Sequence, residues 1–169
     1  MNQSGLDAIF DRRSIRKFQL NRPLEPQTVH QLLEAGFAAP SSRARFPQHF
    51  ILVDDRKILN EMKENHPFMK FLDTVPLVIV VCGDEALSPS WMNDCAASTE
   101  NILLAAQSMG LGACWCGGFP TADRMELFAR LLSLPEHIKA YAAIAVGYPD
   151  EVKGRVNRYQ QERVHQNHF

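Results

Sequence analysis

The densest group of side chains able to do chemistry lies near the N-terminus, in the segment Arg12–Phe18, which reads RRSIRKF. It places four cations and a serine hydroxyl within seven residues, although the whole chain has a formal net charge of only -1. Like charges repel one another, and a bound anion would offset that repulsion. A guanidinium group grips phosphate through paired hydrogen bonds, and a hydroxyl adds a short donor. The residues Arg12, Arg13, Ser14 and Arg16 therefore predict a phosphate clamp, with a solvated basic loop as the alternative that charge alone favours.

Two other groups could complete such a site. Gly117 and Gly118 follow a short predicted strand, and paired glycines there would let backbone N–H groups approach a flat ligand closely. A tight turn before Pro120 is the alternative.

Arg155 and Arg158 are isolated cations near the other end of the chain. They could close over the same phosphate, or they could be ordinary surface charges, which is the interpretation favoured for each residue taken alone.

The common nucleotide-binding motifs do not account for these residues. Gly110 and Gly112 are followed by Trp115 at the place where a dinucleotide-binding loop needs a third glycine. Gly112 and Gly117 have the separation of the P-loop glycines, but the Lys and the Ser or Thr of a P-loop do not follow them. The sequence thus excludes both a Rossmann and a P-loop interpretation of the phosphate clamp.

Length and composition set the class of protein. The chain has 169 residues, of which 46% are hydrophobic and 22% are charged, values typical of one globular domain. The near-neutral net charge argues against general nucleic-acid binding, which requires a broad basic face. The first twenty residues contain no uninterrupted hydrophobic segment, and no later run approaches a membrane-spanning length. We therefore expect a single domain over 1–169 that is soluble and cytoplasmic, with no membrane and no nucleic acid as partner.

Helices and buried strands alternate among the predicted elements that must position the site. Val29, Leu32 and Leu33 recur at helical spacing, whereas Leu77–Cys82 is apolar at every position, which is typical of a strand covered on both faces. Helices are predicted from Ser4 to about Asp11, from Pro26 to about Phe37, over 56–64, over 91–109 and from Thr121 to Leu132. Strands are predicted over 49–53, over 77–82, through Trp115 and over 141–147. This alternation leaves an α/β and an α+β fold open.

The cysteines offer a competing metal-binding interpretation. There are four of them, at Cys82, Cys95, Cys114 and Cys116. One residue separates Cys114 from Cys116, which is not the spacing of a zinc knuckle or of a thioredoxin-like pair. His49 and His66 could in principle complete a metal site, but nothing in the sequence aligns them with the thiols. We therefore expect structural thiols and no metal.

Two segments suggest contacts beyond one chain. The helix predicted over 91–109 is apolar around much of its circumference, so it is expected at the centre of the domain or in a subunit interface. The tail 150–169 is polar and has no clear periodicity, yet it retains Val152, Tyr159 and Phe169. It is expected either to be disordered or to lie across another subunit.

Taken in order, these motifs resemble those of the nitroreductase family of FMN-dependent flavoproteins. The matching segments are RRSIRKF at 12–18, APSS at 39–42 with Pro47 and HFILV at 49–53, HPF at 66–68 through PLVIVVCGD at 76–84, DCAA at 94–97 with ENILLAA at 100–106, GLG at 110–112 with Trp115, VGYP at 146–149 and RVH at 163–165. Each match alone is weak. Together they run in order over nearly the whole chain, which makes the resemblance specific.

The resemblance implies an α+β fold with a central, mostly antiparallel sheet flanked by helices, in an intertwined homodimer with FMN at the interface. It implies one nitroreductase-like domain over 1–169, whose arm 150–169 packs on the partner subunit. By position, Arg12, Arg13, Ser14 and Arg16 look like the FMN contacts of the N-terminal segment, with Arg16 nearer the pyrimidine edge. The remaining implied contacts are Pro40, Ser41 and Ser42 along the isoalloxazine, Gly117 and Gly118 facing its N5, and Arg155 or Arg158 at the phosphate.

The implied activity is the transfer of hydride or electrons from NADH or NADPH to nitroaromatic, quinone-like or related small-molecule acceptors by a ping-pong mechanism. The flavin carries the chemistry, so no side chain is named as a general acid or base. The chain has Ala44, Phe46 and Gln48 where many family members have Asn, Gln and an aromatic residue. These departures keep open a second interpretation, a flavin-binding or flavin-sensing protein without productive turnover.

Overall fold

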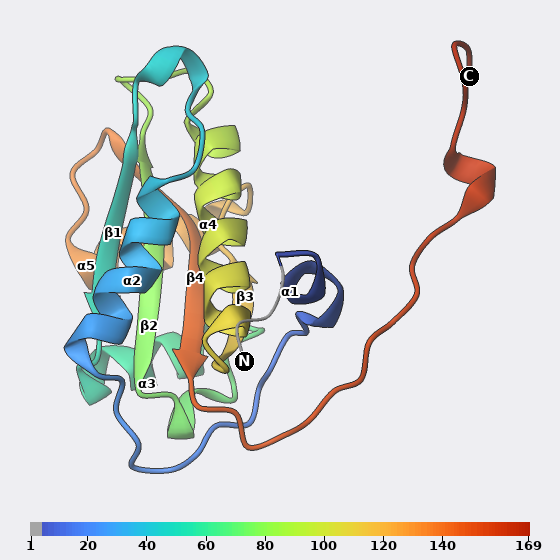
Figure 1. Ribbon diagram of the computed structural model, residues 1–169. Helices are drawn as coiled ribbons and strands as arrows, with labels where there is room; N and C mark the ends of the chain where they lie inside the picture. Colours follow the sequence, from blue (N-terminus) through green and yellow to red (C-terminus); the bar gives the residue numbers. More distant parts are fainter. Residues whose placement is uncertain (1–4) are drawn as a thin grey trace.

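Strand β2 (Leu77–Asp84) is the centre of the fold, and it is buried from Leu77 to Gly83. We obtained this arrangement as a computed structural model that describes residues 5–169. β2 is shielded because a strand lies on each side of it and helices cover both of its faces (Figure 1). The prediction of a strand covered on both faces is confirmed.

Within residues 5–169 the strands form one four-stranded sheet, in the order β1-β2-β4-β3. Its other members are β1 (Gln48–Val53), β3 (Gly112–Gly117) and β4 (Ile138–Gly147). All three strand pairings are antiparallel, and Ile51 pairs with Val80, Val78 with Ala145 and Trp115 with Ile144. Helices and an antiparallel sheet together confirm the α+β fold. β3 forms one edge of the sheet.

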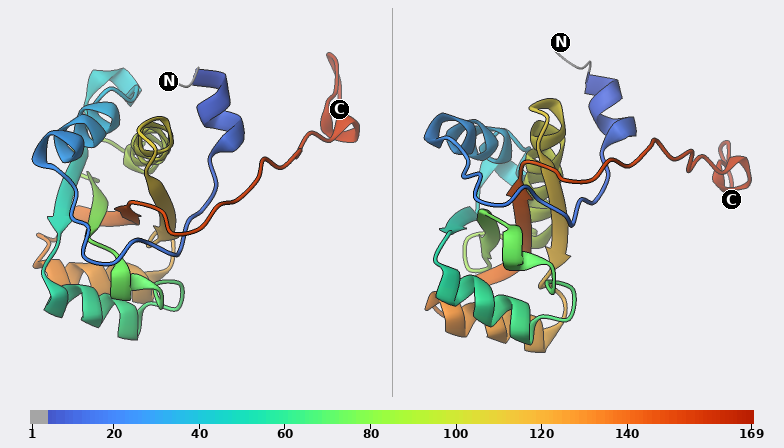
Figure 2. Two further views of the ribbon diagram at one scale, coloured as in Figure 1. Left: turned by 60° about the horizontal axis from the view of Figure 1, so that its bottom comes forward. Right: turned by 90° about the horizontal axis from the view of Figure 1, so that it is seen from below.

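Two pairs of helices cover the two faces of the sheet. Helices α2 (Pro26–Phe37) and α4 (Trp91–Ser108) lie on one face, and α3 (Arg56–Asn65) and α5 (Ala122–Leu132) lie on the other (Figure 2). The alternation of side chains along β2 supplies both cores. The core under α2 and α4 contains Leu32, Ile79, Val81 and Ile102, and the core under α3 and α5 contains Leu59, Met62, Val80 and Phe128.

The N-terminal segment leaves α1 (Gly5–Asp11), which lies beside α4, and runs along the outer side of β3. Ser14 forms a parallel bridge with Ala113, and the N–H of Ile15 donates to the Ala113 carbonyl at 3.0 Å. Gly112 permits this close approach, because a Cβ at that position would lie 2.7 Å from the Ile15 side chain. The predicted helix start at Ser4 lies outside the described residues.

The C-terminal tail runs away from the body of the chain (Figures 1 and 2). Its regular structure among the described residues is one short 3-10 turn, Gln161–Arg163, and its apolar side chains Val152 and Phe169 are fully exposed. α4 is buried along the side that carries Ile102 and Leu103, and its other residues are half-buried or exposed. The packing of the arm on a partner subunit stays a prediction. None of the helices in residues 5–169 is long and apolar enough to cross a membrane.

Candidate functional site

A pocket of about 510 Å³ lies along the outer edge of β3. Its walls are formed by Arg16, Pro67, Phe68, Lys70, Phe71, Cys114, Trp115, Cys116 and Gly117. Most of these residues are aromatic or apolar, and two of them, Arg16 and Lys70, are cations. Flat apolar walls next to positive charge suit a planar ring system that carries negative charge or develops it during a reaction.

Arg16 is held beside the pocket by the beginning of the C-terminal tail. The backbone N–H of Arg16 donates to Glu151 Oε1 at 2.6 Å, and this hydrogen bond is the largest cause of the lowered pKa of Glu151. Lys153 Nζ donates to the Ser14 carbonyl at 2.6 Å and pairs with Glu151 at 3.1 Å. The sequence had given no role to Glu151 or Lys153, because their partners lie more than a hundred residues away along the chain.

His66 fixes the other side of the pocket. Its Nε2 lies 3.1 Å from the Gly117 carbonyl, and its Nδ1 accepts from the Phe68 N–H at 3.3 Å. Since Nδ1 accepts, the proton of the neutral ring lies on Nε2 and is donated to Gly117. The His66 side chain is fully buried, and desolvation is the largest cause of its lowered pKa. The sequence places His66 in one of the family's motifs and offers it as a possible metal ligand, whereas in the structure it links Gly117 to Phe68, two residues of the pocket wall.

The two glycines that the sequence singled out have different positions. Gly117 lines the pocket, whereas Gly118 is buried behind it. A Cβ on Gly118 would lie 3.1 Å from the Ala140 carbonyl and 3.3 Å from the Phe128 ring, so tight packing explains this glycine. Its N–H donates to the Tyr141 carbonyl at 2.9 Å. Of the pair, Gly117 is therefore the residue placed to contact a ligand in the pocket.

The N-terminal segment and the beginning of the C-terminal tail meet beside α1. Arg13 donates to the Gly154 carbonyl, and Arg155 Nε donates to Asp11 at 2.9 Å. Arg12 pairs with Glu100 of α4 at 3.3 Å. Arg12, Arg13 and Arg155 therefore do not line the pocket, although Arg12 and Arg13 belong to the segment Arg12–Phe18, which we call the clamp segment.

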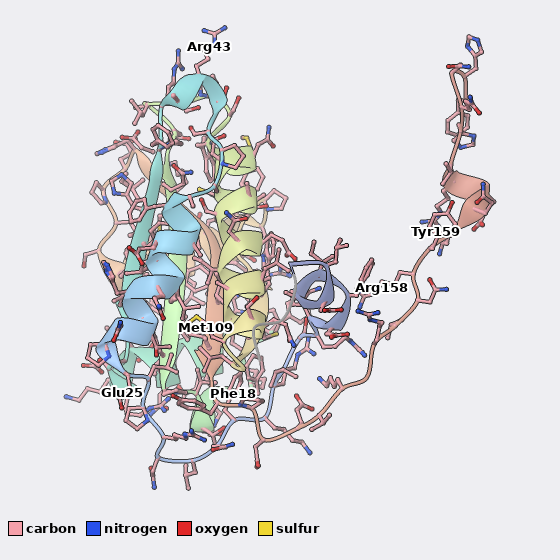
Figure 3. The ribbon with its side chains drawn as sticks, viewed as in Figure 1. Phe18, Glu25, Arg43, Met109, Arg158 and Tyr159 are labelled. Carbon is pink, nitrogen blue, oxygen red and sulfur yellow. The ribbon has the colours of Figure 1, made fainter. Side chains whose placement is uncertain are left out.

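Arg158 extends from the tail further along the chain (Figure 3). Its side chain is exposed. The structure thus brings Arg12, Arg13 and Arg155 together on one side of the molecule and leaves Arg158 apart from them. The contact of these cations with a phosphate stays a prediction.

The segment Pro40–Ser42 lies elsewhere in the molecule, at the beginning of α4. Asp94 is buried there and accepts from the Ser41 hydroxyl at 2.9 Å and from the Ser42 N–H at 3.0 Å. Arg43, which follows directly, lies at the opposite end of the sheet from Phe18 (Figure 3). Within one chain, Pro40–Ser42 and the clamp segment therefore do not share a pocket.

The loop that follows Ser42 has a strained backbone. Arg43, Ala44 and Phe46 adopt φ angles of 55°, 53° and 48°, which residues other than glycine rarely adopt. Ser41 also accepts the Phe46 N–H at 2.9 Å, so hydrogen bonds hold the loop in this conformation. Such strain is found at ligand-binding sites more often than elsewhere. The side chain of Phe46 is exposed at the loop surface.

The residues that the structure describes give no support to the metal-binding interpretation. All four cysteines are buried as free thiols. Within residues 5–169, no three His, Cys, Asp or Glu side chains gather as they would around a metal ion. His49 lies on β1, at the far edge of the sheet from Cys114 and Cys116.

Comparison with known proteins identifies the family. The nitroreductase family model matches residues 9–66 and 63–148. A crystal structure from Parabacteroides distasonis, provisionally named an NADH dehydrogenase/NAD(P)H nitroreductase, is 43% identical, covers 99% of each chain and superimposes with a TM-score of 0.96. A relative from Methanothermobacter thermautotrophicus with the same provisional name is 40% identical over 95% of this chain and 85% of its own. An FMN-dependent nitroreductase from Clostridium difficile is 29% identical, covers 97% of this chain and 99% of its own, and has a TM-score of 0.90.

The family match covers the clamp segment, the pocket at β3 and the Ser41 loop alike. The resemblance that the motifs indicated is therefore confirmed, and the chain belongs to the nitroreductase family.

Proposed function

We propose that this protein is an NAD(P)H-dependent oxidoreductase that uses FMN to reduce electron-poor small molecules. The observation that carries the proposal is the pocket at β3, whose lining combines aromatic side chains with the cations Arg16 and Lys70. These residues fit a flavin, because its ring is flat and becomes electron-rich on reduction. The names of the relatives support the same chemistry, since they include an FMN-dependent nitroreductase and NAD(P)H nitroreductases.

Bound FMN would supply the chemistry by accepting hydride from a nicotinamide and passing the electrons to an acceptor. The residues of this chain would hold and tune that group. Arg16, fixed by Glu151, would stabilise the negative charge that develops at the pyrimidine edge. Phe68 and Trp115 would exclude water from the ring, and Gly117, held by His66, would let the backbone approach it closely. No side chain needs to act as a general acid or base.

We further propose that the working form is a homodimer. In one chain the Ser41 loop and the clamp segment lie at opposite ends of the sheet, so a second copy must bring its loop to the first copy's pocket if both contact one flavin. The half-buried side of α4 and the exposed apolar residues of the tail would then be covered by the partner. Pro40, Ser41 and Ser42 would contact the flavin from the partner subunit.

We also propose the class of compound that accepts the electrons. Nitroaromatic and quinone-like compounds are flat and accept electrons readily, so they would stack where the nicotinamide had been. A single shared place for donor and acceptor gives ping-pong kinetics. The exposed Phe46 ring of the partner's loop would lie beside this place and favour aromatic acceptors.

Anaerobic mixing tests the proposal. The purified protein is loaded with FMN and mixed with NADH or NADPH in the absence of oxygen, and the flavin absorption band is followed. We expect the band to bleach within catalytic times and to return when a quinone is added. A flavin that binds but stays oxidised would support a flavin-binding protein without turnover. Failure to bind FMN at all would refute the proposed function.

A further inference from the structure

A third cation, Arg124, borders the pocket and has no part in the function proposed above. It lies near the start of α5, and its guanidinium carbon is 4.8 Å from the centre of the Phe68 ring. Phe68 belongs to the pocket wall, whereas Arg124 does not line the pocket. Because α5 lies beside α3, it brings Arg124 against the loop 66–71 that follows that helix (Figure 2). Arg124 is therefore placed at the rim of the pocket, in contact with one of its walls.

The charge of Arg124 is not neutralised by a neighbouring carboxylate. Within residues 5–169 no Asp or Glu pairs with it, and it interacts with the Phe68 ring as a cation with an aromatic face. Its acidic neighbours in α5 are Asp123 and Glu126, and side chains one or two positions apart point to different sides of a helix. A guanidinium stacked on a ring keeps N–H groups at its edge, where they can donate to a phosphate in pairs. Arg124 is thus available to an anion at the pocket.

Lys70 adds positive charge to the same side of the pocket. Its Nζ donates to the Glu64 carbonyl at 2.7 Å, and this neutral acceptor leaves the charge of the lysine in place. Desolvation is the largest cause of the lowered pKa of His66, and the charges of Arg124 and Lys70 lower it further, since both lie near this wall. Two cations close together raise the local concentration of anions. This side of the pocket therefore attracts a negatively charged molecule.

The cations predicted to bind the phosphate of FMN lie on another side of the molecule. Arg12 pairs with Glu100 of α4, and Arg155 pairs with Asp11 of α1. α1 and α4 lie on one face of the sheet, and α5 lies on the other (Figure 2). A flavin phosphate held beside α1 would leave Arg124 to a second phosphate-bearing molecule.

We propose that Arg124 and Phe68 bind the dinucleotide donor, with the Arg124 guanidinium on one of its phosphates. This inference rests on the proposed function, in which NADH or NADPH reduces a flavin in the pocket. Both donors join nicotinamide to adenosine through a pyrophosphate, and NADPH has a further phosphate on the adenosine ribose. The nicotinamide must lie against the flavin to react, so the phosphates extend from the pocket toward its rim. The Phe68 ring is 59% exposed and offers the donor an apolar surface along that path.

Donors with and without phosphate test the proposal. The FMN-loaded protein is mixed anaerobically with NADH, NADPH or 1-benzyl-1,4-dihydronicotinamide, which has the same reacting ring and no phosphate. The dependence of the bleaching rate on donor concentration gives the dissociation constant of each donor. In Arg124→Gln we expect the constants of NADH and NADPH to rise at least about tenfold, as a lost charge-assisted hydrogen bond predicts. The benzyl compound and the affinity for FMN should be unaffected.

The two dinucleotides and a control on the same helix sharpen the result. An equal rise for NADH and NADPH would place the Arg124 contact at the pyrophosphate, and a larger rise for NADPH would place it at the additional phosphate. The control Arg130→Gln removes an exposed cation from the last turn of α5 and should leave every constant unchanged.

Four results would overturn the proposal: equal weakening of all three donors, unchanged affinity for both dinucleotides, weaker binding of FMN in Arg124→Gln, or the same loss in Arg130→Gln. If no donor bleaches the flavin of the unaltered protein, the proposed function fails, and calorimetric titration with NAD⁺ and NADP⁺ then decides the contact without turnover. Tighter binding to the unaltered protein than to Arg124→Gln would support the phosphate contact, and equal binding would refute it.

Discussion

The substitution His66→Leu tests whether the link between the two walls of the pocket stabilises the fold. It removes the donor to the Gly117 carbonyl and the acceptor for the Phe68 N–H, and leucine keeps the site filled and apolar. A buried hydrogen bond contributes about 1 kcal/mol, so the loss of two should lower the free energy of unfolding by about 2 kcal/mol. Urea unfolding at a fixed protein concentration measures this as a lower midpoint with an unchanged slope.

The dependence of stability on pH distinguishes the contribution of the His66 imidazole, which can be protonated, from the contribution of its packing alone. Because the folded state lowers the pKa of His66, the unfolded state binds the extra proton first as the solution is acidified. His66 therefore contributes its full stability above its ordinary pKa of about 6.5, and that contribution is lost as the pH falls below it, by up to about 1.4 kcal/mol per pH unit.

His66→Leu should lack that part of the pH dependence, whereas the control His30→Gln, at an exposed position on α2, should retain it. If the pH dependence between about 5 and 7 were the same in His66→Leu and in the unaltered protein, the reasoning would be refuted.

Three further substitutions test other contacts. Asp94→Ala removes the acceptor of Ser41 and of the Ser42 N–H, so stability should fall by about 2–3 kcal/mol and hydrogen exchange at the Ser42 amide should accelerate; slow exchange there would contradict the account. Glu151→Gln should loosen the clamp segment and lower the FMN content after dialysis, and an unchanged content would argue against this role. Phe128→Ala should cost about 3–5 kcal/mol in urea unfolding, because the ring is fully buried, and a loss below about 1 kcal/mol would exclude it from the core.

Most of the secondary structure could be predicted from local pattern. The apolar run Leu77–Cys82 and the helical spacing of Leu32 and Leu33 identify elements that the structure confirms within a few residues. β4 begins at Ile138, three residues before the predicted start at Tyr141. Lys139 interrupts the apolar pattern there, and its pairing with Gly83 across the sheet could not be inferred from sequence.

The sequence predicts some of the residues that line the candidate site, but it does not predict the contacts that hold them in place. Charge density and paired glycines are local signals, and two of the residues they single out, Arg16 and Gly117, line one pocket in the structure. The contact of these two residues with FMN stays a prediction. The residues that position them, Glu151 and His66, were missed, since their contacts join segments far apart in the chain. The Ser41 loop was assigned to the same ligand through the family resemblance alone, and one chain does not bring it to the pocket.

The central proposal is that this chain binds FMN, and we predict that cations of the clamp segment bind its phosphate; a comparison of FMN with riboflavin tests this most directly. Riboflavin has the same ring and lacks the phosphate. The ratio of the dissociation constants of riboflavin and FMN for the cofactor-free protein therefore measures how much the phosphate contacts contribute to affinity. A charge-assisted hydrogen bond contributes about 1.5–3 kcal/mol, so FMN should bind at least about tenfold more tightly, and Arg12→Ala should remove most of that difference. Equal affinities for FMN and riboflavin in the unaltered protein would contradict the account.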